Sequence, residues 1–193
     1  MARTADPAVR TALIETSARL LAEDGLDALS IRRVAREVGT STTAVYTHFG
    51  SKDELVAEVV REAFARLAAE LAAVPRTDDP IADLRGAGEA YRRNALANAD
   101  LYRVMFDRNP TALGDPTTRV DPTVGLDAFG ALSEAVERCV EAGMVDGDPA
   151  ALALRVWAAA HGAVSLELAG FLGDGGHTVF SATAAAVLDG LRS

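Results

Sequence analysis

The chain has 193 residues, of which 49% are apolar and 24% charged. This composition supplies enough apolar surface for a folded core in one domain, or in a small domain joined to a larger one. It contains neither a basic, apolar signal sequence nor 18 consecutive apolar residues, so we expect a soluble, cytoplasmic protein. Its one cysteine, Cys139, excludes an internal disulfide and fits a reducing compartment.

The charge is unevenly distributed along the chain. A formal net charge of −9 argues at first against a nucleic-acid partner. Residues 1–52, however, carry seven basic and six acidic side chains, which leaves 53–193 with a net charge of −10. The sequence therefore predicts a near-neutral N-terminal end on an acidic body.

Helical patterns follow one another along most of the chain, and strand patterns are scarce. Apolar residues recur at helical spacing, and Gly or Pro falls at the breaks between them. A loop with three Asn-Pro or Asp-Pro pairs is expected over residues 108–122. The fold class predicted is all-α, with helices over residues 6–23, 31–38, 42–49, 52–74, 80–98, 101–106, 123–141, 149–169 and 178–191.

The first three helices have the pattern of a helix-turn-helix unit. Ser30 and Ser41 are placed to cap two short helices, and Gly39 allows a tight turn between them, so the reading unit would cover about residues 30–49. If Val45 and Phe49 point inward, the hydroxyl-bearing side of the third helix faces outward. That side consists of Thr42, Thr43, Tyr46 and Thr47.

The composition of this outward side favours contact with a polyanion. Between Gly39 and Ser51 there is neither Glu nor Lys, whereas a merely solvated helix normally contains both. Short hydroxyl groups reach phosphates or base edges without bringing a carboxylate against DNA. Ser51 begins the next helix in a capping box with Glu54. The N-terminus of that helix provides a further anion-binding site. A three-helix bundle whose polar face meets only water remains the alternative.

The run LSIRRVAREVGTSTTAVYTHFGSKDELV, within residues 8–60, resembles the N-terminal domain of tetracycline-repressor-like transcriptional regulators. The resemblance implies that one group of side chains binds phosphates and that another faces the bases. Because alanine and threonine discriminate bases weakly, groove shape would contribute to specificity. The implied phosphate contacts are Tyr46, His48 and Lys52, the base-facing residues are Thr42, Thr43 and Ala44, and Arg32 reaches base or backbone, with Ser41 and Thr47 completing the predicted DNA-binding set.

By the same resemblance, the DNA-binding domain (residues 1–52) is joined to a helical domain (53–193) that dimerises and usually holds a small molecule. Trp157 and His161 lie four residues apart, with Gly162 adjoining. This pattern is similar to a Trp-His-Gly signature found in one subgroup of these regulators. The run YRRNALANADLYRVMF is similar to that subgroup as well.

Small side chains around Gly162 and along the last helix favour a four-helix seam between two protomers, although both helices could instead be interior to one chain. Arg92 and Arg93 are expected on solvated faces. The candidate ligand-binding residues are mostly aromatic, and each could equally be a core residue. They are Phe64, Tyr91, Tyr102, Met105, Phe106, Phe129, Trp157 and His161.

No catalytic constellation is present in the sequence. The three histidines do not have metal-ligand spacing, there is one cysteine, and there is no Gly-x-Ser-x-Gly elbow, so we expect neither an enzyme nor a metal or cofactor. The function predicted is a ligand-responsive repressor that binds an inverted-repeat DNA operator as a homodimer. The alternative is a helical adaptor or small-molecule-binding protein that does not bind DNA.

Overall fold

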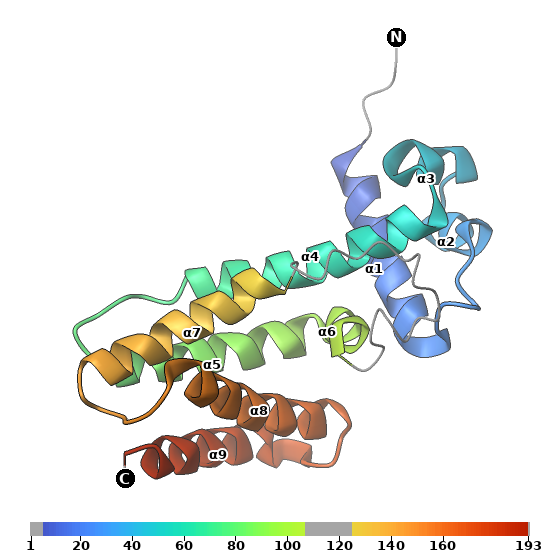
Figure 1. Ribbon diagram of the computed structural model, residues 1–193. Helices are drawn as coiled ribbons and strands as arrows, with labels where there is room; N and C mark the ends of the chain where they lie inside the picture. The colour runs from blue at the N-terminus through green and yellow to red at the C-terminus, as the bar shows by residue number, and fades with distance from the viewer. Residues whose placement is uncertain (1–5, 107–124, 193) are drawn as a thin grey trace. The chain divides into compact units, whose positions relative to one another are not determined.

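The structure is a computed structural model that describes residues 6–106 and 125–192 (Figure 1). Over these residues every regular element is helical, which confirms the all-α prediction. None of the helices in these two stretches has the length and apolar character needed to cross a membrane. The elements are α1 (Pro7–Asp24), α2 (Ile31–Val38), α3 (Thr42–Phe49), α4 (Lys52–Ala72), α5 (Pro80–Ala97), α6 (Ala99–Phe106), α7 (Leu126–Glu141), α8 (Pro149–Leu168), the short 3-10 helix η1 (Gly173–Gly175) and α9 (Gly176–Gly190).

Side-chain caps set the starts of the N-terminal helices where the sequence predicts them. The Ser30 hydroxyl accepts a hydrogen bond from the Arg33 amide at 3.2 Å, and the Ser51 hydroxyl accepts one from the Glu54 amide at 3.0 Å. Asp6 caps α1 in the same way. The loop predicted over residues 108–122 lies outside the described residues.

The chain forms two compact units. The first comprises residues 6–65 and 98–106 of the described chain. In it, α1 packs against α2 and α6, and α2 packs against α3. Its core consists of fully buried aliphatic side chains, among them Leu13, Leu20, Leu29, Val34, Val45, Leu55 and Val59.

The second unit comprises residues 66–97 and 125–192 of the described chain. In it, α8 packs against α5, α7 and α9, and α5 also packs against α7. Cys139 on α7 lies in its core, where the thiol donates to the carbonyls of Pro80 and Ala135 at 3.3 Å. Burial raises the pKa of this thiol, which disfavours the reactive thiolate form. The rest of this core is Ile81, Leu84, Val136, Val145, Leu152, Ala153, Leu188 and Leu191.

The expectation that Arg92 lies on a solvated face is wrong. Its side chain is 17% exposed and pairs with Glu167 of α8, with 2.8 Å between Nε and Oε2. Hydrogen bonding to this carboxylate raises the pKa of Arg92. The pair is accommodated because residue 176 is glycine, where a Cβ would collide with the Glu167 side chain. Arg93 is exposed as expected and pairs with Glu70.

A buried carboxylate holds the connection between α4 and α5 against α7. Asp83 accepts hydrogen bonds from the Thr77 hydroxyl at 2.7 Å, the Thr77 amide at 2.8 Å and the Arg138 guanidinium at 2.7 Å. Together these donors lower the pKa of Asp83 to about 2. Arg138 also donates to the Thr77 carbonyl at 2.6 Å, so the turn before α5 is fixed from two sides.

Candidate nucleic-acid interface

The turn between α2 and α3 is made by a glycine in a left-handed conformation. Gly39 has φ of 73°, and the amide of Thr40 donates to the Ala35 carbonyl at 2.9 Å, which closes the end of α2. Ser41 then caps α3 by accepting from the Ala44 amide at 3.1 Å. This geometry is that of a helix-turn-helix unit.

The predicted outward side of α3 is outward in the structure. Val45 and Phe49 are buried, while Thr43, Tyr46 and Thr47 are exposed, Tyr46 by 53%. The remaining predicted residues of this helix, Thr42, Ala44 and His48, are half-buried. Two helical turns therefore present hydroxyl groups at one surface, with the half-buried His48 beside Phe49.

One of these hydroxyl groups is already engaged. Thr47 donates its proton to the Thr43 carbonyl at 2.8 Å. Since phosphate oxygens only accept hydrogen bonds, Thr47 would have to rotate before it could contact a phosphate. The Ser41 hydroxyl acts as an acceptor in its cap, which leaves its own proton available.

Lys52, the first residue of α4, is held at the edge of this surface. Its ammonium donates to the Leu26 carbonyl at 2.8 Å, and the side chain is half-buried. One of the three ammonium donors is used in this bond, so the others remain for an anion. The bond fixes the position of the charge in advance.

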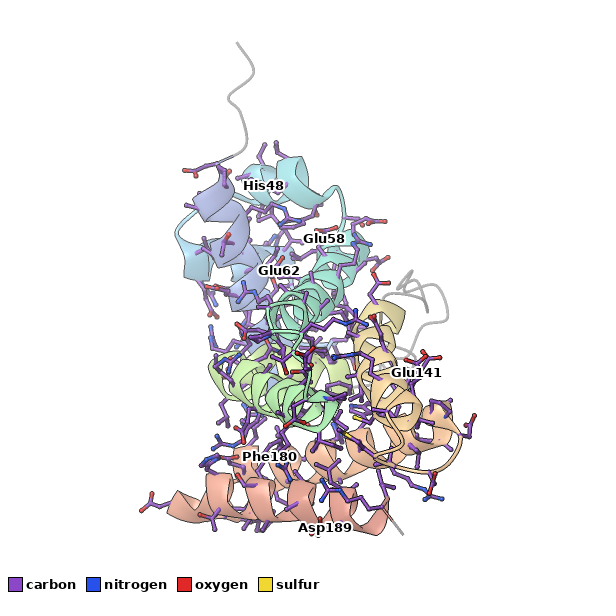
Figure 2. The ribbon with its side chains drawn as sticks, turned by 90° about the vertical axis from the view of Figure 1, so that its left-hand side faces the viewer. His48, Glu58, Glu62, Glu141, Phe180 and Asp189 are labelled. Carbon is purple, nitrogen blue, oxygen red and sulfur yellow. The ribbon has the colours of Figure 1, made fainter. Side chains whose placement is uncertain are left out.

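Arg10 contacts the inner side of α3 near its end. The Arg10 guanidinium lies 5.8 Å from the centroid of the Phe49 ring and pairs with Glu58 of α4. The His48 ring lies next to the Phe49 ring, with 5.8 Å between the centroids; His48 and Glu58 are labelled in Figure 2. Arg10 therefore helps to hold α3 against α1 and α4.

Tertiary contacts divide the arginines of α1 and α2 into two classes. Arg19 pairs with Glu23 and Glu37, and Arg33 pairs with Asp24 and Glu37. Hydrogen bonds from Arg33 and Arg19 lower the pKa of the Glu37 carboxyl. Within the described chain, the exposed Arg32 and Arg36 enter no ion pair, so their charges remain available to an anionic partner.

Arg36 is the residue that the sequence analysis missed. It lies one helical turn after Arg32 on α2 and is exposed like it. The i, i+4 spacing of the two arginines in the sequence was a signal that could have found it. What the sequence did not show is that Arg33, between them, is neutralised by α1.

The candidate ligand-binding residues form two separate aromatic groups, one in each compact unit. In the first unit, the Phe106 ring lies 4.9 Å from Tyr102 and 6.4 Å from Phe64, centroid to centroid, in edge-on geometry. Met105 of the same helix α6 is buried. The three rings therefore pack edge to face, with Tyr102 buried and Phe64 and Phe106 half-buried.

In the second unit, Trp157 lies between Phe129 and His161, with centroid distances of 6.1 Å and 5.7 Å. The Tyr91 hydroxyl lies 3.0 Å from Nδ1 of His161, which joins α5 to α8. This group combines a polar pair with two large rings, as small-molecule sites often do. Among residues 6–106 and 125–192, no three His, Cys, Asp or Glu side chains are grouped so as to hold a metal ion.

Two family descriptions match the chain. The family "Bacterial regulatory proteins, tetR family" matches residues 13–59, and "Tetracyclin repressor-like, C-terminal domain" matches residues 84–191. The first covers α2 and α3 with most of α1 and the start of α4. The second covers most of the second unit and spans more than half of the chain.

Individual proteins agree with these matches. An uncharacterized HTH-type transcriptional regulator of Mycobacterium tuberculosis is 29% identical over 172 residues, which are 86% of this chain and 72% of that protein. The class C tetracycline repressor protein of Escherichia coli is 33% identical over 53% of this chain, and this chain spans 47% of its length. The TetR family transcriptional regulator PfmR of Thermus thermophilus superposes with a TM-score of 0.75 at 26% identity, over 94% of this chain and 99% of the other.

The helix-turn-helix geometry, the outward hydroxyl side of α3 and both family matches point to the same conclusion. The second family description also accounts for the helical second unit. The chain belongs to the tetR family of bacterial regulatory proteins, and it is a DNA-binding transcriptional regulator.

Proposed function

We propose that this regulator is a homodimeric, cytoplasmic repressor that reads an inverted-repeat operator and releases it when a small molecule binds. The observation that carries the proposal is the outward side of α3, exposed at Thr43 and Tyr46 and flanked by Arg32 and Arg36 of α2, which enter no ion pair with any described residue. The class C tetracycline repressor protein of E. coli, a relative, is a repressor by its name.

The DNA-contacting residues divide by chemistry. Tyr46, His48 and Lys52 are proposed to bind phosphates, because they carry a phenol, an imidazole and an ammonium near the end of α3 and the start of α4. Thr42, Thr43 and Ala44, in the first turn of α3, are proposed to face base edges. Arg32, with Arg36, adds charge from α2. The proposed DNA-binding domain is residues 1–52, and the ligand-binding and dimerisation domain is residues 53–193.

The proposed dimer interface is the outer face of α8 and α9. Along α8, Leu154, Ala158, Gly162 and Leu166 are exposed at helical spacing, and Leu154 is 53% exposed. On α9, Val179, Ala182 and Ala186 are exposed in the same way. The two helices pack against each other in Figure 1, so together they offer one apolar face to a second copy. A dimer supplies two reading helices for half-sites about 34–36 Å apart.

The effector site is proposed at the aromatic group of the second unit. Its Trp157, His161 and Gly162 form the pattern by which we assign the chain to the Trp-His-Gly subgroup. The Tyr91–His161 contact joins α5 to α8, so a ligand inserted there would separate or rotate these helices. A ligand that binds one conformer better shifts the population toward it and changes DNA affinity by the same coupling.

Selection of bound sequences from random duplex DNA tests the proposal. We expect an enriched inverted repeat for which the logarithm of the affinity falls linearly with the logarithm of salt concentration. Enrichment of a single, unrepeated half-site would contradict the proposal that the protein binds DNA as a dimer. It would still agree with α3 as the helix that contacts DNA. The absence of any enrichment in dilute salt would instead favour an adaptor that does not bind DNA.

A further inference from the structure

A hollow of about 260 Å³ lies between α5, α8 and α9 in the second unit. It is bounded largely by apolar and small side chains, and none of the eight candidate ligand-binding residues lines it. The lining includes Leu84 and Gly88 from α5, Ala160 from α8, and Phe180, Ala184 and Leu188 from α9.

The hollow exists because facing positions on the three helices are small. A Cβ on Gly88 would lie 3.6 Å from Cζ of Phe180, which is ordinary contact distance, so the Phe180 ring lies against α5 at Gly88 and forms one wall of the hollow; Phe180 is labelled in Figure 2. Alanines on α8 and α9 leave the space beside that ring unfilled. Protein interiors are normally close-packed, and an apolar space larger than a few water molecules is uncommon.

A single unpaired cation borders this space. Arg85 of α5 is exposed and, over the described residues, forms no ion pair, unlike Arg76, Arg92 and Arg138 of the same unit. Glu89 also borders the hollow, but its carboxylate already faces Nδ1 of His177 at 3.8 Å. The rim therefore carries a cation with no ion-pair partner among the described residues, Arg85, and an anion that lies beside an imidazole, Glu89.

We propose that this hollow binds a small amphipathic carboxylate. Its apolar body would lie against Phe180 and the small residues, and its carboxylate would accept hydrogen bonds from the planar Arg85 guanidinium. The volume is just below the range of about 300–1,000 Å³ typical of small-molecule pockets, so the ligand is small. This site goes beyond the proposed regulation, because binding here requires neither α3 nor the aromatic group around His161.

Three probes that differ only in their polar end test the charge preference. 4-Phenylbutyrate, 4-phenylbutanol and 4-phenylbutylamine are titrated calorimetrically into the full chain without DNA. We expect the carboxylate to bind about ten-fold more tightly than the alcohol, because a hydrogen-bonded charge pair is stronger than a neutral contact. Stronger binding of the amine, or no saturable binding of the carboxylate up to about 10 mM, would overturn the proposal.

Variants then locate the site. Arg85→Gln should reduce the affinity for the carboxylate to that for the alcohol, whereas Arg155→Gln, which removes an exposed arginine of α8 outside the lining, should change neither. Glu89→Gln should raise the affinity for the carboxylate alone, since it removes a nearby like charge.

Variants that fill the hollow with a larger side chain test whether the probes bind inside it. Ala160→Leu and Ala184→Leu should each abolish binding of both the carboxylate and the alcohol, and circular dichroism identifies which of the two keeps its helical content. Undiminished binding by a folded filling variant would place the probe elsewhere and overturn the proposal. Because no DNA is present, these outcomes are separate from success or failure of the operator selection.

Discussion

On α2, Arg33 and Arg36 lie three residues apart and yet differ in their partners. Arg33 is shared between Asp24 and Glu37, whereas Arg36 is exposed and belongs to none of the ion pairs of the described chain. When a free guanidinium neutralises a phosphate, the counterion bound to the DNA there is released. A guanidinium that is already paired with carboxylates neutralises the phosphate less and therefore displaces fewer of these DNA counterions. The availability of an arginine to DNA is therefore decided by its neighbours as much as by its exposure.

We expect Arg36→Ala to lower the slope of log affinity against log salt concentration by about one. Arg33→Ala is the matched control, and it should leave that slope nearly unchanged, because the Arg33 charge is already paired with Asp24 and Glu37. Fluorescence anisotropy with a labelled operator at several salt concentrations measures both slopes. Equal reductions for the two variants would show that the ion pairs do not withhold Arg33 from DNA.

Asp83 provides a prediction on pH. Its pKa is about 2 in the folded protein, below its ordinary value of 3.8, so it stabilises the fold above about pH 4. That stabilisation is lost as pH falls through about 2, because the unfolded chain then binds the proton first. Asp83→Asn lacks this group and should be less stable than wild type at neutral pH.

The difference in unfolding free energy between wild type and Asp83→Asn should shrink as pH falls from about 4 toward about 2. The slope of this difference against pH should correspond to uptake of at most about one proton on unfolding. Urea unfolding midpoints at a series of pH values measure it. Asp78→Asn, an exposed carboxylate in the same connection, is the control and should show little difference from wild type at any pH. A difference that stays constant with pH would mean that Asp83 stabilises the turn only through its shape.

At the scale of the element, the ends of the helices depend on a few backbone positions. The turn between α2 and α3 needs a residue at φ of 73°, which costs an L-residue with a side chain about 1–2 kcal/mol. No atom would contact a Cβ at Gly39, so the penalty there is purely conformational. Gly130 within α7 also has open space around it but has an ordinary helical backbone.

The same substitution should therefore have opposite effects at these two glycines. Gly39→Ala is expected to lower the free energy of unfolding by about 1 kcal/mol, and Gly130→Ala to raise it by about 0.5–1 kcal/mol. Urea unfolding followed by circular dichroism measures both. A loss of stability at Gly130 as well would indicate that the turn between α2 and α3 is not the special case.

At the scale of the whole molecule, the outer face of α8 and α9 is apolar, although residues 53–193 carry a net charge of −10. Leu154 and Leu166 are 53% and 47% exposed, with Ala158 and Gly162 between them. Small residues flanked by larger apolar ones allow two helices to approach closely. An exposed face of this kind is stable in water when a second copy covers it.

In the proposed dimer Ala158 lies within the buried face of α8, so Ala158→Glu should place a carboxylate from each copy in that interface and convert the dimer to a monomer. Analytical ultracentrifugation is expected to show the halved mass, and affinity for an inverted repeat should fall to that for a single half-site. Ala82→Glu, at an exposed alanine near the start of α5, is the control and should remain dimeric. A dimeric Ala158→Glu protein would move the interface away from α8.

The sequence by itself determined the helices and the outward side of α3, because both follow from local periodicity and from caps such as Ser41 and Gly39. Only the tertiary structure decided which charges are available. Arg19 meets Glu37 and Arg92 meets Glu167 across 18 and 75 residues, and no helical period predicts such contacts. The same holds for the division of the aromatic residues between two units and for the hollow beside Phe180. Those features depend on which helices pack together, a property of the assembled chain that no single segment carries.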